Sequence, residues 1–126
     1  MKLLLDTHIL LWWLSDNEQL SSKARELISK PDNDIYVSHI SLWEIQIKVM
    51  TGKLEVDLNN LISQLPQNNF LQLPSHTDHI LCLAKLPPYH QDPFDRMLIA
   101  QALSEPLNLI THDKYVAMYS GSIILV

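Results

Sequence analysis

The sequence predicts an α/β protein in which a parallel β-sheet is covered by helices on both faces. Short apolar runs of strand length alternate along the chain with longer segments of helical periodicity. Elements that alternate in this way form βαβ units, and the parallel sheet they build is buried on both sides. A chain of 126 residues, 47% of them hydrophobic, is long enough for one domain with its own core. We therefore expect a single domain over residues 1–126.

The first third of the chain predicts two strands and two helices. A helix from Thr7 is stopped near Ser15-Asp16-Asn17, and a second ends at Lys30-Pro31. The elements expected here are a strand at 2–5, a helix at 7–14, a helix opening at 20–22, and a strand at 35–37.

The middle of the chain predicts two more helices and a third strand. Leu42, Ile45 and Val49 recur at helical spacing in a helix that begins at Ser41, and Thr51-Gly52 is a good stop. The elements expected here are a helix at 41–50, a helix from 58 to 65 ended by Pro66, and a strand at 70–73.

The last third predicts two helices and two strands. The run Ser75-His76-Thr77-Asp78 resembles a capping box for a helix through Ala84. The Leu86–Gln91 loop then precedes a helix from Pro93 to about Ser104. The remaining expected elements are strands at 107–110 and 122–126.

Composition excludes several classes of protein. The single cysteine, Cys82, excludes an intramolecular disulfide framework and a cysteine-rich zinc site. Asp6 and His8 interrupt the N-terminal apolar run, and no later run approaches the ~20 residues of a membrane span. We therefore expect a soluble cytoplasmic protein. The net charge of −5, taken alone, argues against a domain that binds phosphate backbones through a basic face.

Four acids follow predicted strands or open predicted helices: Asp6, Glu44, Asp95 and Asp113. Each has a structural interpretation as a cap of a helix or turn. Glu44 lies three residues after Ser41, in an S-x-x-E capping box, and Asp92 ahead of Pro93 is an N-cap that needs no further explanation.

Together the four acids favour a metal site. Asp6 and Asp113 follow strands, and Glu44 and Asp95 lie in what we expect to be first helical turns, so all four meet at the carboxyl edge of a parallel sheet. Clustered carboxylates repel one another and need a cation to stay ionised. Hard oxygen ligands without histidine or cysteine partners suit Mg²⁺ or Mn²⁺, which points to metal-assisted phosphodiester chemistry.

The same residues carry a resemblance to a known family. Five segments in order along the chain resemble the PIN domain and, more narrowly, the VapC-type toxin ribonucleases of toxin–antitoxin systems. They are Leu4-Leu5-Asp6-Thr7-His8, Ser41-Leu42-Trp43-Glu44-Ile45, Thr51-Gly52-Lys53-Leu54, the run from His90 to Ala102, and Thr111-His112-Asp113. The run from His90 to Ala102 is the most specific of the five.

The resemblance implies a PIN-like three-layer α/β/α sandwich around a mostly parallel sheet of four to five short strands. It implies an endoribonuclease that depends on Mg²⁺ or Mn²⁺ and hydrolyses RNA with a metal-activated water. Asp6, Asp95 and Asp113 would be metal ligands and Glu44 would act through a metal-bound water, which together make the catalytic set. It also implies a homodimer and a cognate antitoxin that places a basic segment near the site.

Supporting residues are less specific. Thr7 and Thr111 flank site acids and are candidates to orient a carboxylate, although turn capping explains them equally well. Arg96 has a phosphate-binding and a structural interpretation, and we favour the structural one. The six histidines as a set show no zinc-binding spacing and are expected to be mostly structural. His8, His90 and His112 lie near the predicted site and are candidate phosphate contacts.

Two rival functions are open at this point. The first is a catalytically inactive PIN-like protein-binding module, against which the intact set of four acids argues. The second is a phosphotransfer domain with Asp6 as nucleophile, which lacks a second Asp two residues on because His8 stands there.

The net charge takes a different meaning under the metal hypothesis. Four of the 14 acids belong to the predicted site, so a protein loaded with two divalent ions would have a charge near −1. With 9 Lys and Arg residues in all, RNA affinity is expected to depend heavily on metal and on shape.

Overall fold

The computed structural model describes all residues, 1–126, and places five parallel strands in one sheet. The strands are β1 (Lys2–Leu5), β2 (Asp34–Ser38), β3 (Leu71–Leu73), β4 (Asn108–Thr111) and β5 (Ile124–Leu125). Their order is β3-β2-β1-β4-β5, and all four pairings are parallel. The predicted α/β class and the strand number are confirmed.

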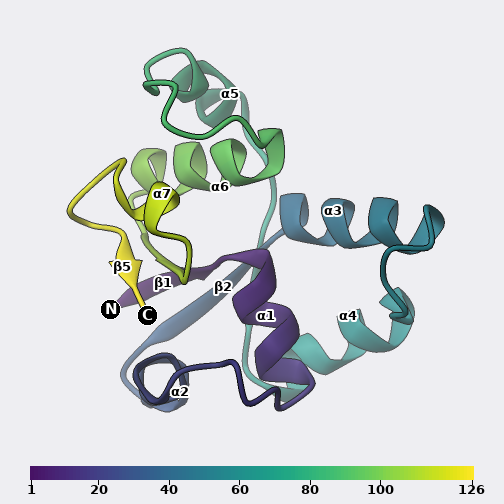
Figure 1. Cartoon of the computed structure of the whole chain (residues 1–126). Coiled ribbons are helices and arrows are strands. Elements are labelled where there is room, and N and C mark those ends of the chain that lie inside the picture. Colours follow the sequence, from purple (N-terminus) through teal and green to yellow (C-terminus); the bar gives the residue numbers. More distant parts are fainter.

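Seven helices surround this sheet (Figure 1). They are α1 (Thr7–Leu14), α2 (Ser22–Ser29), α3 (His39–Met50), α4 (Leu58–Gln67), α5 (Thr77–Leu83), α6 (Pro93–Ser104) and α7 (Lys114–Ala117). α1, α2 and α4 lie on one side of the sheet and α5 and α6 on the other, which confirms the three-layer arrangement. No helix is both long enough and apolar enough to span a membrane.

The central strand β1 divides the core into two halves by side-chain alternation. Leu3 and Leu5 point into the cluster beneath α1, α2 and α4, while Leu4 points into the cluster beneath α6 and α7. All three leucines are fully buried. β1 is therefore fixed on both faces, which holds the residue that follows it in place.

The strand order creates a crevice at one edge of the sheet. The chain runs from β1 outward through β2 to β3, and then returns to the other side of β1 for β4 and β5. Strand order reverses between β1 and β4, and such switch points are where open parallel sheets bind ligands, at the carboxyl ends of their strands.

The capping box predicted for Ser41 and Glu44 is wrong. α3 begins two residues earlier, at His39, because the Ser38 hydroxyl at the end of β2 accepts the Ile40 N–H (2.9 Å) and caps the helix without a loop. Glu44 consequently lies in the second turn of α3, not in the first. Its side chain is free for contacts other than capping.

Three further local predictions need correction. α5 is capped by His76 and His79, not by Ser75 and Asp78. α4 continues past Pro66 to Gln67, since the fixed φ of proline is compatible with a last helical turn. The short helix α7 was not expected; the Asp113 carboxylate accepts the Tyr115 N–H (2.8 Å) and caps it.

Candidate active site

Asp6 lies at the switch point, directly after β1. Its Oδ1 accepts the N–H of Thr7 (2.7 Å) as the cap of α1, and its Oδ2 accepts the Thr111 hydroxyl (2.6 Å) from the end of β4. Only 4% of the residue is exposed. Burial is the main reason that the pKa of Asp6 is raised, and the charge of Glu44 adds to the effect.

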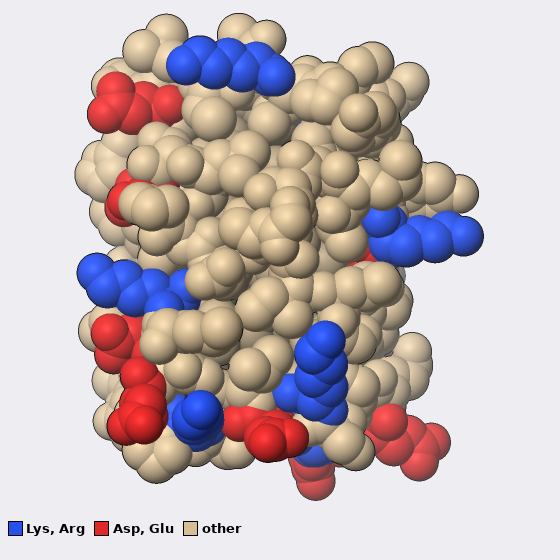
Figure 2. Space-filling model, turned by 90° about the vertical axis from the view of Figure 1, so that its left-hand side faces the viewer, with Lys and Arg blue, Asp and Glu red and all other residues tan.

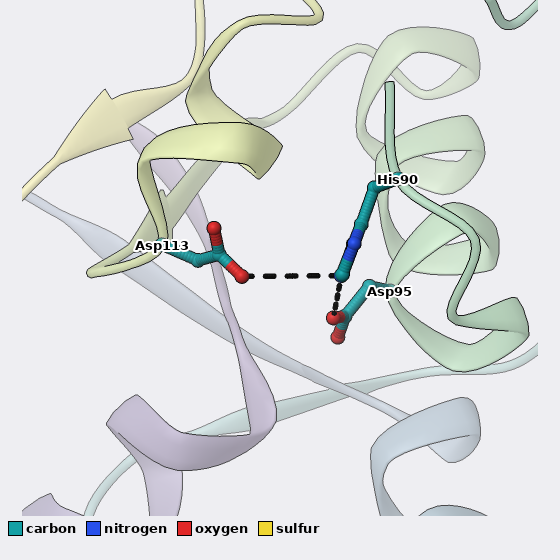
Figure 3. Close-up of side chains that lie close together, drawn as sticks. All are labelled: His90, Asp95 and Asp113. Carbon is teal, nitrogen blue, oxygen red and sulfur yellow. Dashed lines mark hydrogen bonds and ion pairs between the residues drawn. The ribbon is translucent and has the colours of Figure 1, made fainter. Parts of the chain in front are cut away.

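Asp95, Asp113 and His90 converge on the same edge from three segments. The His90 ring precedes α6 and its Nε2 lies 2.6 Å from Asp95 Oδ2 in the first turn of α6 and 3.9 Å from Asp113 Oδ2 (Figure 3). One donor atom from each of the three lies within 4.8 Å of the other two. Asp92 caps α6 by accepting the N–H groups of Phe94 and Asp95, as predicted.

Asp95 shows how strongly this region resists negative charge. Burial, and next the charge of Asp6, raise the pKa of Asp95 to about 7, although the hydrogen bond from His90 acts in the opposite direction. Burial alone lowers the pKa of His90, but its hydrogen bond to Asp95 and the surrounding carboxylates outweigh burial and raise it. The acids of the site thus outnumber the cationic side chains that pair with them, Lys48 and His90.

Glu44 is held by two partners. Its Oε1 accepts the Thr7 hydroxyl (2.8 Å), which also lies 2.9 Å from the Ser41 hydroxyl, and its Oε2 pairs with Lys48 Nζ (2.7 Å). The hydrogen bond to Glu44 is the main reason that the pKa of Lys48 is raised. Thr7, which follows Asp6, thus connects Glu44 to the end of β1 across 37 positions of sequence.

The donor set fits a hard divalent cation. The carboxylate oxygens are ligands that Mg²⁺ and Mn²⁺ prefer, and the His90 imidazole accompanies them as a hydrogen-bond partner of Asp95. The raised pKa values of Asp6 and Asp95 also favour a divalent cation at the site, because a bound cation would stabilise the ionised form of both acids.

The supporting residues have distinct positions. Thr7 and Thr111 each donate a hydrogen bond to a site carboxylate. The Arg96 guanidinium contacts no acid; it donates to the carbonyls of Leu86, Pro87 and His90 and to the Tyr119 hydroxyl, which is the kind of contact that the structural interpretation of Arg96 predicts. The His112 ring packs edge-on against Trp12, with 4.7 Å between the ring centroids.

Sequence reasoning undervalued two residues at the site. His90 was considered only as a phosphate contact, and its place five residues before Asp95 gave no sign of a hydrogen bond across the helix cap. Lys48 pairs with Glu44, and its i,i+4 spacing from Glu44 on a predicted helix is a readable signal for this ion pair.

The fold and the site together define an α/β protein with a carboxylate cluster at the switch point of a parallel sheet. The family model of the PIN domain matches residues 3–120. The chain belongs to the PIN domain family, as the sequence motifs indicated.

The individual proteins to which the chain is similar share between 17% and 26% of its sequence. The chain is 26% identical over 115 residues to Ribonuclease VapC22 of Mycobacterium tuberculosis (strain ATCC 25618 / H37Rv), covering 88% of this chain and 86% of the relative. Its fold is similar to that of VapBC2 from Rickettsia felis, solved bound to a DNA fragment from the promoter (TM-score 0.71, 17% identity, 100% of this chain and 98% of that chain). It is also similar to VapBC-1 from nontypeable Haemophilus influenzae (TM-score 0.68, 18% identity, 100% and 97% covered).

Proposed function

We propose that this protein is a metal-dependent endoribonuclease and the toxin of a toxin–antitoxin pair. The observation that carries the proposal is the cluster of buried or half-buried carboxylates at the switch point, in which burial, together with the charge of neighbouring acids, raises the pKa values of Asp6 and Asp95. Membership of the PIN family and the likeness to a protein named as a ribonuclease support the choice of reaction.

Each site residue has a role in this proposal. Asp6, Asp95 and Asp113 hold Mg²⁺ or Mn²⁺, which supplies a Lewis acid that activates water and neutralises charge on the phosphate. Thr111 and the N–H of Thr7 fix the Asp6 carboxylate. Lys48 and Thr7 fix Glu44, which orients water at the site instead of ligating the cation.

RNA is the substrate we propose. Figure 2 shows that, on the face it presents, Lys and Arg side chains are scattered among acids without forming a basic patch. Because the whole protein has a net charge of −5 with 9 Lys and Arg residues, we expect its contact with RNA to depend on the metal. Water as nucleophile leaves a 5′-phosphate and a 3′-hydroxyl and makes no use of the RNA 2′-hydroxyl.

The proposed partner is an antitoxin that places a basic segment near the acids. The solved complexes to which the fold is similar are toxin–antitoxin assemblies, and a carboxylate cluster short of cations suits lysine or arginine. We propose in addition that the single domain forms a homodimer and acts in the cytoplasm. The exposed Ile80 and Leu81 on α5 are candidate dimer contacts, which light scattering of the purified protein tests.

The test of the nuclease proposal is cleavage of RNA by the purified protein. We expect cleavage with Mg²⁺ or Mn²⁺, none with a chelator, and 5′-phosphate ends when the products are sequenced. A protein that binds its antitoxin but cleaves no RNA with either metal would favour the inactive binding module. Products with a 2′,3′-cyclic phosphate would overturn the role of water.

A further inference from the structure

The largest cleft of the protein opens beside the acid cluster. It has a volume of about 520 Å³ and lies between α1 and the segment that follows α3, which carries Lys53, Leu54 and Val56. Clefts that hold small ligands have volumes of roughly 300–1,000 Å³. The cleft is therefore large enough for more than a few waters.

Two residues connect this cleft to the candidate active site. Thr7 and Lys48 both line the cleft, and both contact the carboxylate of Glu44. A polymeric ligand that places one of its monomers at the acid cluster can therefore place the adjoining monomer in the cleft.

The charges of the cleft favour an anion. Lys48 and Lys53 line it and no Asp or Glu does, although the whole protein is acidic. Because Lys48 is paired with Glu44, Lys53 supplies the charge that a ligand can use. Lys53 is exposed and forms no ion pair, so its ammonium is available to a ligand. The smaller hollow next to it has the opposite character, since Glu55 and Asp57 line that one. A basic protein segment thus suits the smaller hollow, and a phosphate suits the cleft.

The cleft also contains an aromatic surface. Trp12 is half-buried on its wall, and the rings of His8 and His112 hold the indole at centroid distances of 5.9 Å and 4.7 Å. Leu11, Leu54 and Val56 supply apolar area around it. Nucleic-acid bases bind by stacking on such fixed aromatic rings, with cationic side chains nearby for the phosphates.

We propose that the cleft is the subsite for a nucleotide of the RNA that adjoins the scissile phosphate. The base packs against Trp12, and its phosphate lies near Lys48 and Lys53. This inference rests on the proposed nuclease function and deepens it, because it assigns substrate recognition to residues outside the acid cluster.

The test uses two variants with matched controls. Trp12→Leu and Lys53→Ala remove the aromatic and the cationic contact; Trp13→Leu and Lys30→Ala are the controls, since Trp13 and Lys30 line a different hollow. Circular dichroism confirms that each variant is folded. We expect Trp12→Leu to raise KM for a short single-stranded RNA about tenfold and Lys53→Ala about threefold, with kcat within twofold of wild type. The controls retain the wild-type KM.

A second readout separates this inference from the nuclease proposal. Nucleoside monophosphates are titrated into the chelator-treated protein, and tryptophan fluorescence is recorded. We expect quenching in wild type and in Trp13→Leu, and none in Trp12→Leu, whether or not the protein cleaves RNA. A wild-type KM in both Trp12→Leu and Lys53→Ala would overturn the subsite even if cleavage is confirmed. If Trp12→Leu and Lys53→Ala lose antitoxin binding but keep the wild-type KM, the cleft binds the protein partner. That result would also overturn the proposed nucleotide subsite.

Discussion

The protein buries polar side chains in two regions that differ in their balance of charge. Beneath α5, His79 is fully buried; its Nδ1 accepts the His76 N–H (3.0 Å), and its ring also contacts Gln101 and Glu105. Gln101 is in turn bonded to Ser38 at the end of β2. In this network each donor meets an acceptor, with a single carboxylate at its rim.

The acid cluster has the opposite balance. Asp6, Glu44, Asp95 and Asp113 are all acceptors when ionised, and Lys48 and His90 are the only cationic partners that pair with them. Burial is the main cause of the raised pKa values of Asp6 and Asp95, and the charges of neighbouring acids add to it. The comparison teaches that burial of polar groups does not by itself mark a functional site; a deficit of positive charge does.

The largest expected effect comes from removing one acid of the cluster. Asp6→Asn keeps the shape of the side chain and removes its charge. We expect RNA cleavage to fall by at least about a thousandfold, because a metal ligand is lost, while the fold is retained. Asp32→Asn, at an exposed turn, is the control with wild-type cleavage. A folded Asp6→Asn protein that cleaves like wild type would show that Asp6 is not part of the catalytic site.

The pH dependence of stability gives the next largest effect. Asp95 has a usual pKa of 3.8 and a folded value of about 7, so the folded state holds a proton that the unfolded state releases. The stability that this proton contributes is present below about pH 4 and is lost as pH rises to 7, on the order of 3–4 kcal/mol. Denaturant unfolding of the metal-free protein measures this loss.

Two changes should flatten this pH profile. Asp95→Asn removes the titrating group, and Mn²⁺ at pH 7 replaces the missing proton. If metal-free wild type and Asp95→Asn lose stability equally between pH 4 and 7, the folded state does not hold a proton on Asp95.

Substitutions in the hydrogen-bonded network around His79 should lower the stability of the protein and leave its activity unchanged. His79→Ala removes a fully buried ring and leaves Gln101 with a lost partner, which should lower the free energy of unfolding by about 2–3 kcal/mol. Cleavage per folded molecule should stay within twofold of wild type. The exposed His39 is the matched control, with less than about 0.5 kcal/mol expected for His39→Ala. A large loss of kcat in His79→Ala would assign the network a functional role.

The smallest predicted effect concerns how the cluster is oriented. Thr111→Val is close to isosteric and removes the hydroxyl that donates to Asp6 Oδ2. Partners of this kind change metal affinity by roughly 10–100-fold when removed, and we expect the lower end. Thr111→Ser should restore the affinity in a Mn²⁺ titration. Equal Mn²⁺ affinities of wild type, Thr111→Val and Thr111→Ser would show that the Thr111 hydroxyl does not orient Asp6.

Much of the fold could be predicted from sequence because its signals are local. The strand ends at Leu5 and Ile110 were readable to within a residue, since buried parallel strands are short apolar runs. Asp92 and Pro93 marked the start of α6 for the same reason: a cap acts within one turn. The approach of Asp95 to Asp113 follows from the rule that parallel strands end at one edge; the group of donor atoms within 4.8 Å of one another contains these two acids and His90, and not Asp6 or Glu44.

What sequence reasoning missed depends on contacts between distant segments. The Thr7 hydroxyl reaches Glu44 across the sheet edge, and the Ser38 hydroxyl begins α3 without a loop, which moved Glu44 out of the first turn. His79 is polar at a position that packs α5 onto α6, and no periodicity distinguishes it from the exposed His76. These features arise from packing, which one sequence does not display.

Calorimetric titration of Mn²⁺ into the chelator-treated protein at pH 7.5 tests the central claim most directly. The claim is that the carboxylate cluster at the switch point is completed by a divalent cation. We expect saturable binding to wild type, at least tenfold weaker binding to Asp6→Asn, and unchanged binding to His79→Ala. No binding to wild type, or equal binding to wild type and Asp6→Asn, would contradict it.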